Sequence, residues 1–191
     1  THYPNCISFG GAFGTTSVYD NYFYDGGSSV YFANAQGTLN IANNVFKNVG
    51  KTTFTAPDGG NKGDFCIAIY RSGYANTTTA NILANEFDGC YGQASLFPLI
   101  RIYQGTSGST NVVTPVGFRV NVNENTFKNK ISVLPSASHN QAGEKVLLYN
   151  DLSTGKAIKY NLSNNHFDNR LYKFAWVTLD DGQGCREIYA D

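Results

Sequence analysis

The chain of 191 residues has no methionine, a single tryptophan, few charged side chains and no net charge. Charged residues make up 15% of the chain, and 14 basic side chains balance 14 acidic ones, so the basic stripe that nucleic-acid binding calls for is lacking. No apolar run reaches the roughly 18 residues of a membrane-spanning helix. We therefore expect neither a nucleic-acid partner nor a membrane span.

Paired cysteine motifs are also lacking. The four cysteines do not form the CxxC pairs typical of a zinc site, so we expect no metal at them. Their even number, in a chain low in charge and rich in Thr, Asn and Tyr as exported proteins are, permits disulfides. Buried free thiols would fit a packed interior equally well. The spacing indicates no connectivity for Cys6, Cys66, Cys90 and Cys185.

No long segment has apolar residues at helical spacing, which excludes the helical repeat folds. The chain has instead a seven-residue phrase that occurs five times, with asparagine fifth and phenylalanine seventh. Its phenylalanines are 23, 41, 40 and 40 residues apart, and such a period is typical of a solenoid, whose units bury their apolar faces by stacking. The copies are SVYDNYF (17–23), NIANNVF (40–46), NILANEF (81–87), NVNENTF (121–127) and NLSNNHF (161–167).

Strands fit the step between phrases, because 23 residues hold about three short strands and their corners. The longer steps then contain one coil plus a loop of about 17 residues. We predict an all-β fold: a single right-handed parallel β-helix (β-solenoid) of about five coils over residues 1–191. Loop insertions are expected at 49–64, 104–117 and 129–144.

The chain begins at Thr1 without a methionine or a signal-peptide pattern. We therefore expect it to be a fragment of a longer secreted or cell-surface protein. The exposed end coils of a solenoid call for a cover, so a capping domain or an oligomer partner is expected at the ends.

Side chains at equivalent places in successive coils lie above one another, which predicts two internal columns. The repeated asparagines would form an amide ladder with a spacing of about 4.8 Å, and the phenylalanines an aromatic column. The residues that follow each phenylalanine, as in FKN and FDG, are turn formers and predict a corner. His166, in the variable position before the last phenylalanine, should face solvent.

A second family of strands lies between the phrases, at CIAIYRSG (66–73), LIRIYQG (99–105), VLLYND (146–151) and FAWVTLDD (174–181). Aligning them on tyrosine predicts a column of Tyr70, Tyr103 and Tyr149, completed by Thr178. Alternation sends one set of residues to the core: Ile67, Ile69, Ile100, Ile102, Val146, Leu148, Ala175 and Val177. The opposite face carries Ala68, Arg101, Leu147 and Trp176, with Arg71, Gln104 and Asn150 following at the strand ends.

An outward row of aromatic rings edged by arginines and amides has the chemistry of a sugar-binding surface, because Arg, Gln and Asn bond to hydroxyls and carboxylates. The residues predicted to bind substrate are Tyr70, Tyr103, Gln104, Tyr149, Asn150 and Trp176. Tyrosine is also a favoured strand residue, so a purely structural row, packed beneath a loop, is the alternative.

Catalytic groups are scarce. Glycoside hydrolysis needs two carboxylates about 5 to 9.5 Å apart. Glu86 and Asp88 are candidates by spacing, but Asp88 begins a corner, and the adjacent Asp180 and Asp181 would point to opposite faces of an extended chain. A hydrolytic pair is therefore the less favoured expectation.

The Asn-x-Phe phrases with intervening IAIYRSG-type strands resemble, over nearly the whole chain, the pectate-lyase-like right-handed parallel β-helix superfamily. YRSG (70–73), followed by NILANEF, is similar to the Lys/Arg-Ser/His-Gly segment of the alginate lyase and chondroitinase B family. The likeness implies that Arg71 is a catalytic or carboxylate-neutralising cation, with Arg101 one coil further. The acidic run that binds calcium in that family is missing, as is a paired catalytic lysine.

A glycine-rich acidic loop, DGGNKGD (58–64), places Asp58, Asn61 and Asp64 at a spacing that could wrap calcium, although a plain turn is the favoured interpretation. We predict no metal and no cofactor. The predicted function is recognition of an extracellular polysaccharide, with lyase-type cleavage of a uronic-acid-containing glycan left open. A non-catalytic surface adhesin or a structural β-helix spacer is the alternative.

Overall fold

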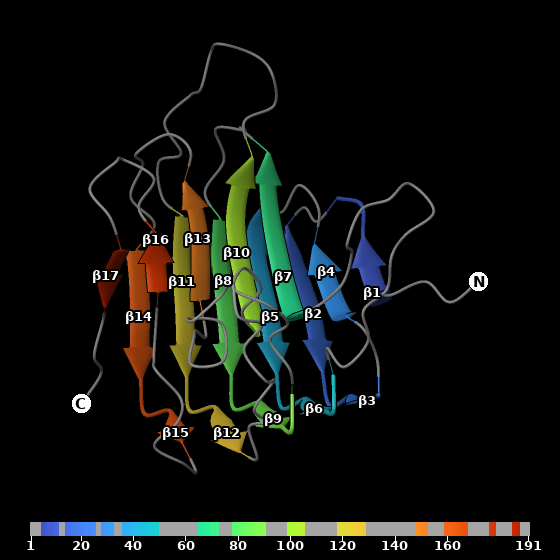
Figure 1. Ribbon diagram of the computed structural model, residues 1–191. Helices are drawn as coiled ribbons and strands as arrows, with labels where there is room; N and C mark the ends of the chain where they lie inside the picture. Colours follow the sequence, from blue (N-terminus) through green and yellow to red (C-terminus); the bar gives the residue numbers. More distant parts are fainter. Residues whose placement is uncertain are drawn as a thin grey trace, which may run out of the picture.

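The computed structural model describes most of the repeated part of the chain: residues 5–11, 14–25, 28–32, 36–49, 65–72, 78–90, 99–105, 118–128, 148–152, 159–167, 176–178 and 185–187. Within these residues the fold is all-β, without a helix. The strands form three five-stranded parallel sheets, the third of which lies below the other two in the view of Figure 1, and a two-stranded antiparallel sheet follows in the sequence. The predicted insertions at 49–64, 104–117 and 129–144 lie almost entirely outside the described residues.

Every third strand belongs to the same sheet, so three consecutive strands form one repeat unit, called a coil here. The first sheet contains β1 (Asn5–Phe9), β4 (Ser28–Phe32), β7 (Phe65–Ser72), β10 (Ile100–Gly105) and β13 (Leu148–Leu152). The second contains β2 (Thr15–Tyr19), β5 (Gly37–Ala42), β8 (Thr78–Leu83), β11 (Phe118–Asn123) and β14 (Lys159–Ser163). The third contains β3 (Tyr22–Tyr24), β6 (Val45–Lys47), β9 (Glu86–Asp88), β12 (Thr126–Lys128) and β15 (His166–Phe167).

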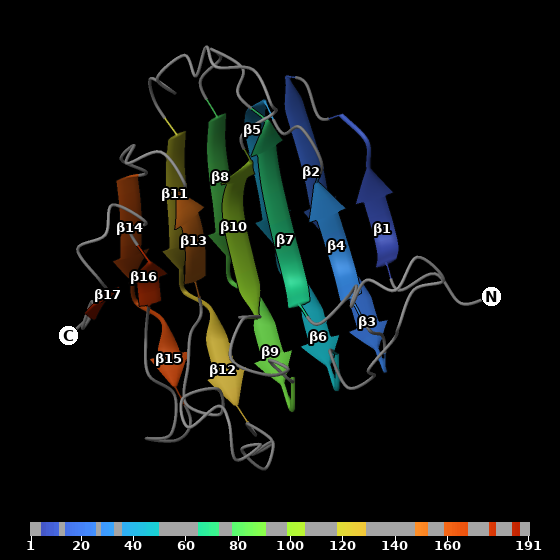
Figure 2. The ribbon, with the colours of Figure 1, turned by 45° about the horizontal axis from the view of Figure 1, so that its top comes forward.

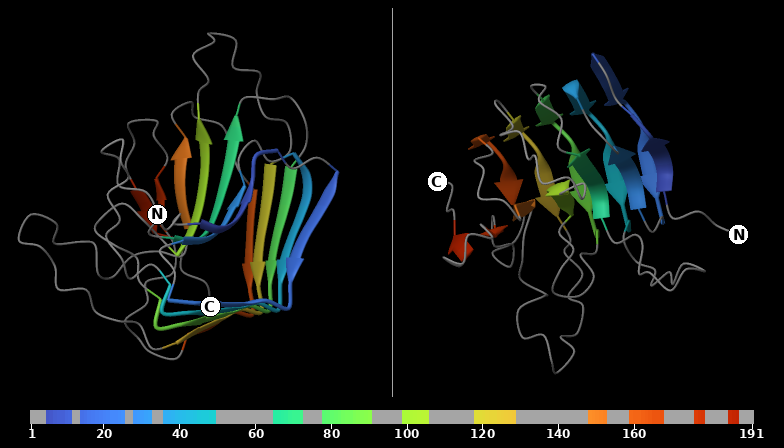
Figure 3. Two further views of the ribbon diagram at one scale, coloured as in Figure 1. Left: turned by 90° about the vertical axis from the view of Figure 1, so that its right-hand side faces the viewer. Right: turned by 90° about the horizontal axis from the view of Figure 1, so that it is seen from above.

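The coils follow one another along one direction, from β1 at one end to β13, β14 and β15 at the other (Figure 2). Seen along that direction, the strands of each sheet lie behind one another, and the second and third sheets meet at a sharp corner (Figure 3). This arrangement of parallel strands in stacked sheets is compatible with the predicted β-solenoid.

The corner between the second and third sheets is made by two residues in every coil. The first has a left-handed backbone, with φ between 52° and 60° at Asp20, Asn43, Ala84, Glu124 and Asn164. Its N–H donates to a carbonyl of the next coil, as in Asn43 to Leu83 at 3.1 Å. The chain therefore turns without losing the hydrogen bonds between coils. A second left-handed residue follows the third sheet at Asp25, Asn48 and Gly89, which confirms the turn predicted after phenylalanine.

The second corner residue is the repeated asparagine, and it forms the predicted amide ladder. The side-chain amide of each asparagine donates to the Oδ1 atom of the next, at 3.1 Å for the first pair and 3.0 Å for the other three. The same Oδ1 accepts the backbone N–H of the preceding asparagine. The ladder residues are Asn21, Asn44, Asn85, Asn125 and Asn165, of which the middle three are buried.

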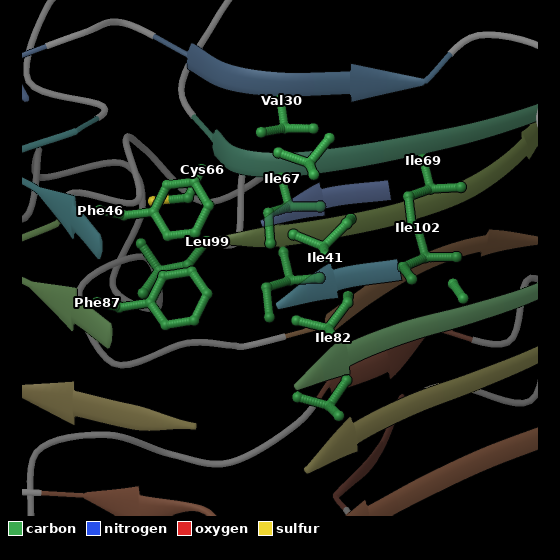
Figure 4. Close-up of a cluster of buried hydrophobic side chains, with 14 of the residues drawn as sticks. Val30, Ile41, Phe46, Cys66, Ile67, Ile69, Ile82, Phe87, Leu99 and Ile102 are labelled. Carbon is green, nitrogen blue, oxygen red and sulfur yellow. The ribbon is translucent and has the colours of Figure 1, made fainter. Parts of the chain in front are cut away.

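The phenylalanines form the predicted aromatic column. Successive rings are nearly parallel, with centroids 4.9, 5.0, 4.7 and 5.1 Å apart from Phe23 through Phe46, Phe87 and Phe127 to Phe167. Isoleucines and valines of the first and second sheets, together with Phe32, Leu39 and Ala80, fill most of the rest of the described interior (Figure 4). Ile67, Ile69, Ile100 and Ile102 are fully buried, as predicted.

Candidate functional site

Two predicted binding residues lie opposite each other in the first sheet. Tyr70 in β7 and Tyr103 in β10 are direct partners in the parallel register, and Arg71 is paired with Gln104 one position further. The backbone therefore forms the first two steps of the expected tyrosine column. The structure describes the backbone of these four residues, whereas their side chains lie outside the described part.

The expected column does not continue to Tyr149, and this prediction was wrong. Tyr103 pairs with Asp151 in β13, while Tyr149 pairs with Arg101, two residues earlier. Gln104 is likewise opposite Leu152 rather than Asn150. A shift of two residues leaves the apolar alternation unchanged, so the alternation on which the alignment was based could not detect it.

Trp176 and Thr178 belong to a different kind of pairing. β16 (Trp176–Thr178) packs beside β13, but its register is antiparallel, with β17 (Cys185–Glu187). The prediction that Thr178 completes a parallel column is therefore not met in the described strands. Trp176 stays a binding candidate by position only, because its side chain, like those of Tyr149 and Asn150, is outside the described part.

The two arginines of the lyase hypothesis lie in neighbouring strands but in different columns. Arg71 is in register with Gln104, and Arg101 is in register with Ala68, three positions earlier along β7. Residues share a face of a strand when an even number of positions separates them. The register therefore does not by itself bring Arg71 and Arg101 together.

The face of the first sheet that was expected to be outward is covered at one point. Ala68 was assigned to that face, yet it is completely buried, and Tyr31, its partner in β4, is half-buried. Ser8, one strand nearer the start of the chain, is exposed. This part of the sheet is therefore open at β1 and closed at β7, as a row packed beneath other chain segments would be.

Three tyrosines that the sequence analysis did not select are the exposed large hydrophobic side chains of the described residues. Tyr19 and Tyr22 are each 62% exposed, and Tyr24 is 56% exposed. All three belong to the first coil, at the corner between β2 and β3. The rings of Tyr22 and Tyr24 are 6.3 Å apart between centroids and 18° from parallel. The signal was in the segment SVYDNYFY (17–24), in which the three tyrosines are neighbours of the buried Val18 or Phe23.

The charged residues of the third sheet are used in ion pairs between coils. Lys47 and Lys128 are the register partners of Asp88 on its two sides. The Lys47 ammonium lies 3.2 Å from the Asp88 carboxylate, and that of Lys128 lies 2.8 Å from Glu86. The hydrogen bond and the charge of Asp88 raise the pKa of Lys47. Glu86 and Asp88 therefore serve as partners of lysines, which argues against a hydrolytic pair.

A second row of asparagines lies on the face of the second sheet that points away from the core. The Asn121 amide donates to Asn81 at 2.7 Å, and the Asn81 amide donates to Asn40 at 2.9 Å. These side chains are half-buried, whereas the three middle residues of the corner ladder are buried. His166 is exposed, as predicted.

No group of three His, Cys, Asp or Glu residues that could hold a metal ion occurs among the described residues. The acidic loop with Asp58, Asn61 and Asp64 lies outside them. Where the structure is described, no helix is long and apolar enough to cross a membrane. Comparison of the chain with protein-family models, with curated proteins and with solved structures finds no match.

Proposed function

We propose that this chain recognises an extracellular polysaccharide along the lateral faces of its stacked sheets, and that its fold is a right-handed β-helix of the pectate-lyase-like kind. Right-handed crossovers are the general rule for parallel strands. The observation that carries the proposal is the group of three exposed tyrosines on the first coil, because solvent-exposed aromatic rings of this size are expected to have a partner.

The geometry of Tyr22 and Tyr24 suits a flat ligand. Their rings stand side by side, nearly parallel, on one short strand. The apolar face of a sugar ring can pack on such rings, while the phenol groups exchange hydrogen bonds with its hydroxyls. Lys47, the register partner of Tyr24, is paired with Asp88, so the two tyrosine rings carry this part of the proposal.

The in-register pair Tyr70 and Tyr103 on the first sheet is the second candidate surface. Gln104 and Arg71 extend it by one position. The two surfaces lie on different sheets, so single substitutions can separate their contributions to binding.

The strand register favours recognition of the glycan without cleavage. A lyase would need a base to remove the proton on C5 of a uronic acid, so that a C4–C5 double bond forms as the bond to O4 breaks. Cations would have to neutralise the carboxylate at the same place. Arg71 and Arg101 occupy columns three positions apart, which does not favour convergence.

A structural spacer is the second candidate function, and a specific observation favours it. Along the described third sheet, Lys47, Glu86, Asp88 and Lys128 are engaged with one another rather than free for a ligand. A spacer would bind no glycan at all, so one experiment separates the two functions.

The test is a glycan array followed by titration of any hit. The double variant Tyr22→Ala/Tyr24→Ala should weaken binding by about 10-fold or more, as expected for loss of aromatic anchors. Tyr103→Ala tests the second surface, and His166→Ala, an exposed residue of the same column as Tyr22, is the matched control. A blank array, or affinity unchanged in both tyrosine variants, would overturn the proposal.

Cleavage is tested separately by incubation with uronate polymers. An unsaturated product absorbs near 232 nm, and Arg71→Ala should abolish its formation if cleavage occurs. Glycan binding without formation of the unsaturated product would identify a non-catalytic binding module.

A further inference from the structure

Two cysteines mark the beginning and the end of the same coil. Cys66 is the second residue of β7, with which the third coil starts, and Cys90 follows β9, with which that coil closes. Because a coil returns to the corner where it began, residues 24 positions apart in the sequence meet here. Both are buried, with exposures of 0% for Cys66 and 2% for Cys90.

The contacts of the two side chains converge on one place. The two thiols are neighbours in the core, close enough for Cys90 to contribute to the raised pKa of Cys66, and the Cys90 thiol donates to the carbonyl of Phe46 at 3.1 Å. Cys66 belongs to the same group of core side chains as Phe46, Phe87 and Leu99 (Figure 4). Both thiols are free in this structure.

The backbone hydrogen bonding is irregular at Cys66. The carbonyl of Leu99 accepts the N–H of both Cys66, at 2.8 Å, and Ile67, at 3.0 Å. Two residues of β7 thus oppose one of the next coil, as in a β-bulge. Cys66 and Ile67, which regular alternation would send to opposite faces, are both part of the core cluster.

The equivalent places in the preceding coil hold Ser29 and Val49, both buried. The corner therefore packs with other small side chains, and cysteines are not needed to fill it. Of the coils that the structure describes at both places, the third alone combines two thiols, which calls for an explanation beyond packing.

We propose that Cys66 and Cys90 are joined by a disulfide when the protein folds under oxidising conditions, so that the third coil becomes a covalently closed ring. The oxidant is a small disulfide such as oxidised glutathione. One cysteine thiolate attacks it and releases one glutathione thiolate. The other cysteine thiolate then displaces the second, so that two protein thiols are oxidised and one small disulfide is reduced to two thiols.

The state of the folded thiols indicates when the bond forms. Burial raises the pKa of the Cys66 thiol, and the neighbouring Cys90 adds to this effect. The reactive thiolate is therefore rare once the core is packed. We infer that oxidation takes place during folding, before the third coil is covered.

The topology opposes the alternative pairing with Cys6. That residue lies in β1, in the same column as Ser29 and Cys66, with the strand β4 between it and β7. Two strand spacings correspond to about 9.6 Å between Cα atoms, whereas a disulfide needs about 4.4 to 6.8 Å.

The test is disulfide mapping of protein refolded with a mixture of reduced and oxidised glutathione. Free thiols are alkylated in denaturant, and the protein is digested without reduction. We expect one linked peptide pair containing Cys66 and Cys90, both in the natural chain and in the variant Cys6→Ala/Cys185→Ala. Recovery of both residues as alkylated thiols, or linkage of Cys66 to Cys6, would overturn the proposal.

A second measurement tests the consequence for stability. Reductant should lower the Tm of the oxidised protein by several degrees, and Cys90→Val should remove this sensitivity. Valine is the conservative choice because Val49 fills the equivalent position one coil earlier. If this variant does not fold, the peptide map of the natural chain still decides between the two states.

Discussion

The corner between the second and third sheets and the strands of the first sheet are stabilised in different ways. At the corner, two residues connect the sheets in every coil, and an asparagine side chain bonds to the coils before and after it. The connections that lead into the first sheet differ greatly in length, such as 25–27 before β4 and 129–147 before β13. Apart from the buried Ser29, its described core side chains are apolar.

The difference separates two ways of fixing the register between coils. An amide that donates and accepts at fixed atoms is satisfied in one register only, and a displaced copy leaves buried polar groups without partners. Apolar side chains that alternate along a strand pack almost as well after a shift of two residues. The corner therefore fixes the register between coils, and the strands of the first sheet adopt the register that the corner allows.

The largest expected effect is the loss of a central ladder residue. Asn85→Ala removes the amide that donates to Asn125 and to the Ile41 carbonyl, and it removes the acceptor of two Asn44 N–H groups. Several buried groups lose their partners at once, so we expect a loss of about 3 to 5 kcal/mol in the free energy of unfolding. Chemical denaturation measures it.

The matched control is Asn81→Ala in the half-buried outer row, which should cost about 1 kcal/mol. Equal losses in the two variants would show that the corner has no special role.

The next largest effect is the pH dependence of the free energy of unfolding that Cys66, a residue of the first sheet, contributes. The folded pKa of Cys66 lies above its usual value of 9.0 because the thiol is buried. Its contribution to stability is complete below about pH 9 and falls at higher pH, since the unfolded chain releases the proton first. In reductant, the free energy of unfolding should fall by up to about 1.4 kcal/mol per pH unit from this one group.

Cys66→Ala should remove the part of the fall in unfolding free energy with pH that comes from this thiol. The contribution of other titrating groups should stay unchanged. Identical pH profiles for the two proteins above pH 9 would contradict the assignment.

The comparison is sharpened by a substitution that should stabilise the corner. Ala84 is exposed and has a left-handed backbone with φ of 52°, a conformation that asparagine tolerates better than alanine. Asn43 and Asn164 occupy the same place in other coils. Ala84→Asn should therefore raise the free energy of unfolding by about 0.5 to 1 kcal/mol. A loss of stability would show that this corner is not left-handed.

The smallest effect is expected for an ion pair on the third sheet. Glu86→Gln removes the contact with Lys128, whose side chain is 31% exposed while that of Glu86 is 37% exposed. Solvent screens such pairs, so the expected loss is below about 1 kcal/mol and should vanish in 1 M salt. A double-mutant cycle with Lys128→Gln isolates the pair, and a salt-independent loss would argue for packing instead.

The sequence predicted the features that depend on the repeated phrase. The amide ladder, the phenylalanine column, the turn after phenylalanine and the exposure of His166 all follow from residues at fixed places in that phrase. Each of these features depends on an interaction between equivalent residues of successive coils or on a particular backbone conformation. The residue types that favour it can be recognised directly in the sequence.

Other features could not be read from the sequence. The register of Tyr149 was wrong because alternation does not distinguish shifts of two residues. The burial of Ala68 depends on what covers the sheet, and the meeting of Cys66 with Cys90 depends on where a coil closes. The exposed tyrosines of the first coil were not predicted, because the repeat holds other residue types at these places, such as Val45 and Glu86 in the column of Tyr22.

Nuclear Overhauser contacts between side-chain amides test the stacking of the corners most directly. In protein labelled with nitrogen-15 at asparagine, the account predicts contacts from the Asn44 amide protons to those of Asn85, and from Asn85 to those of Asn125, across 40 residues or more of sequence. Contacts from these amides only to their own sequence neighbours would contradict it.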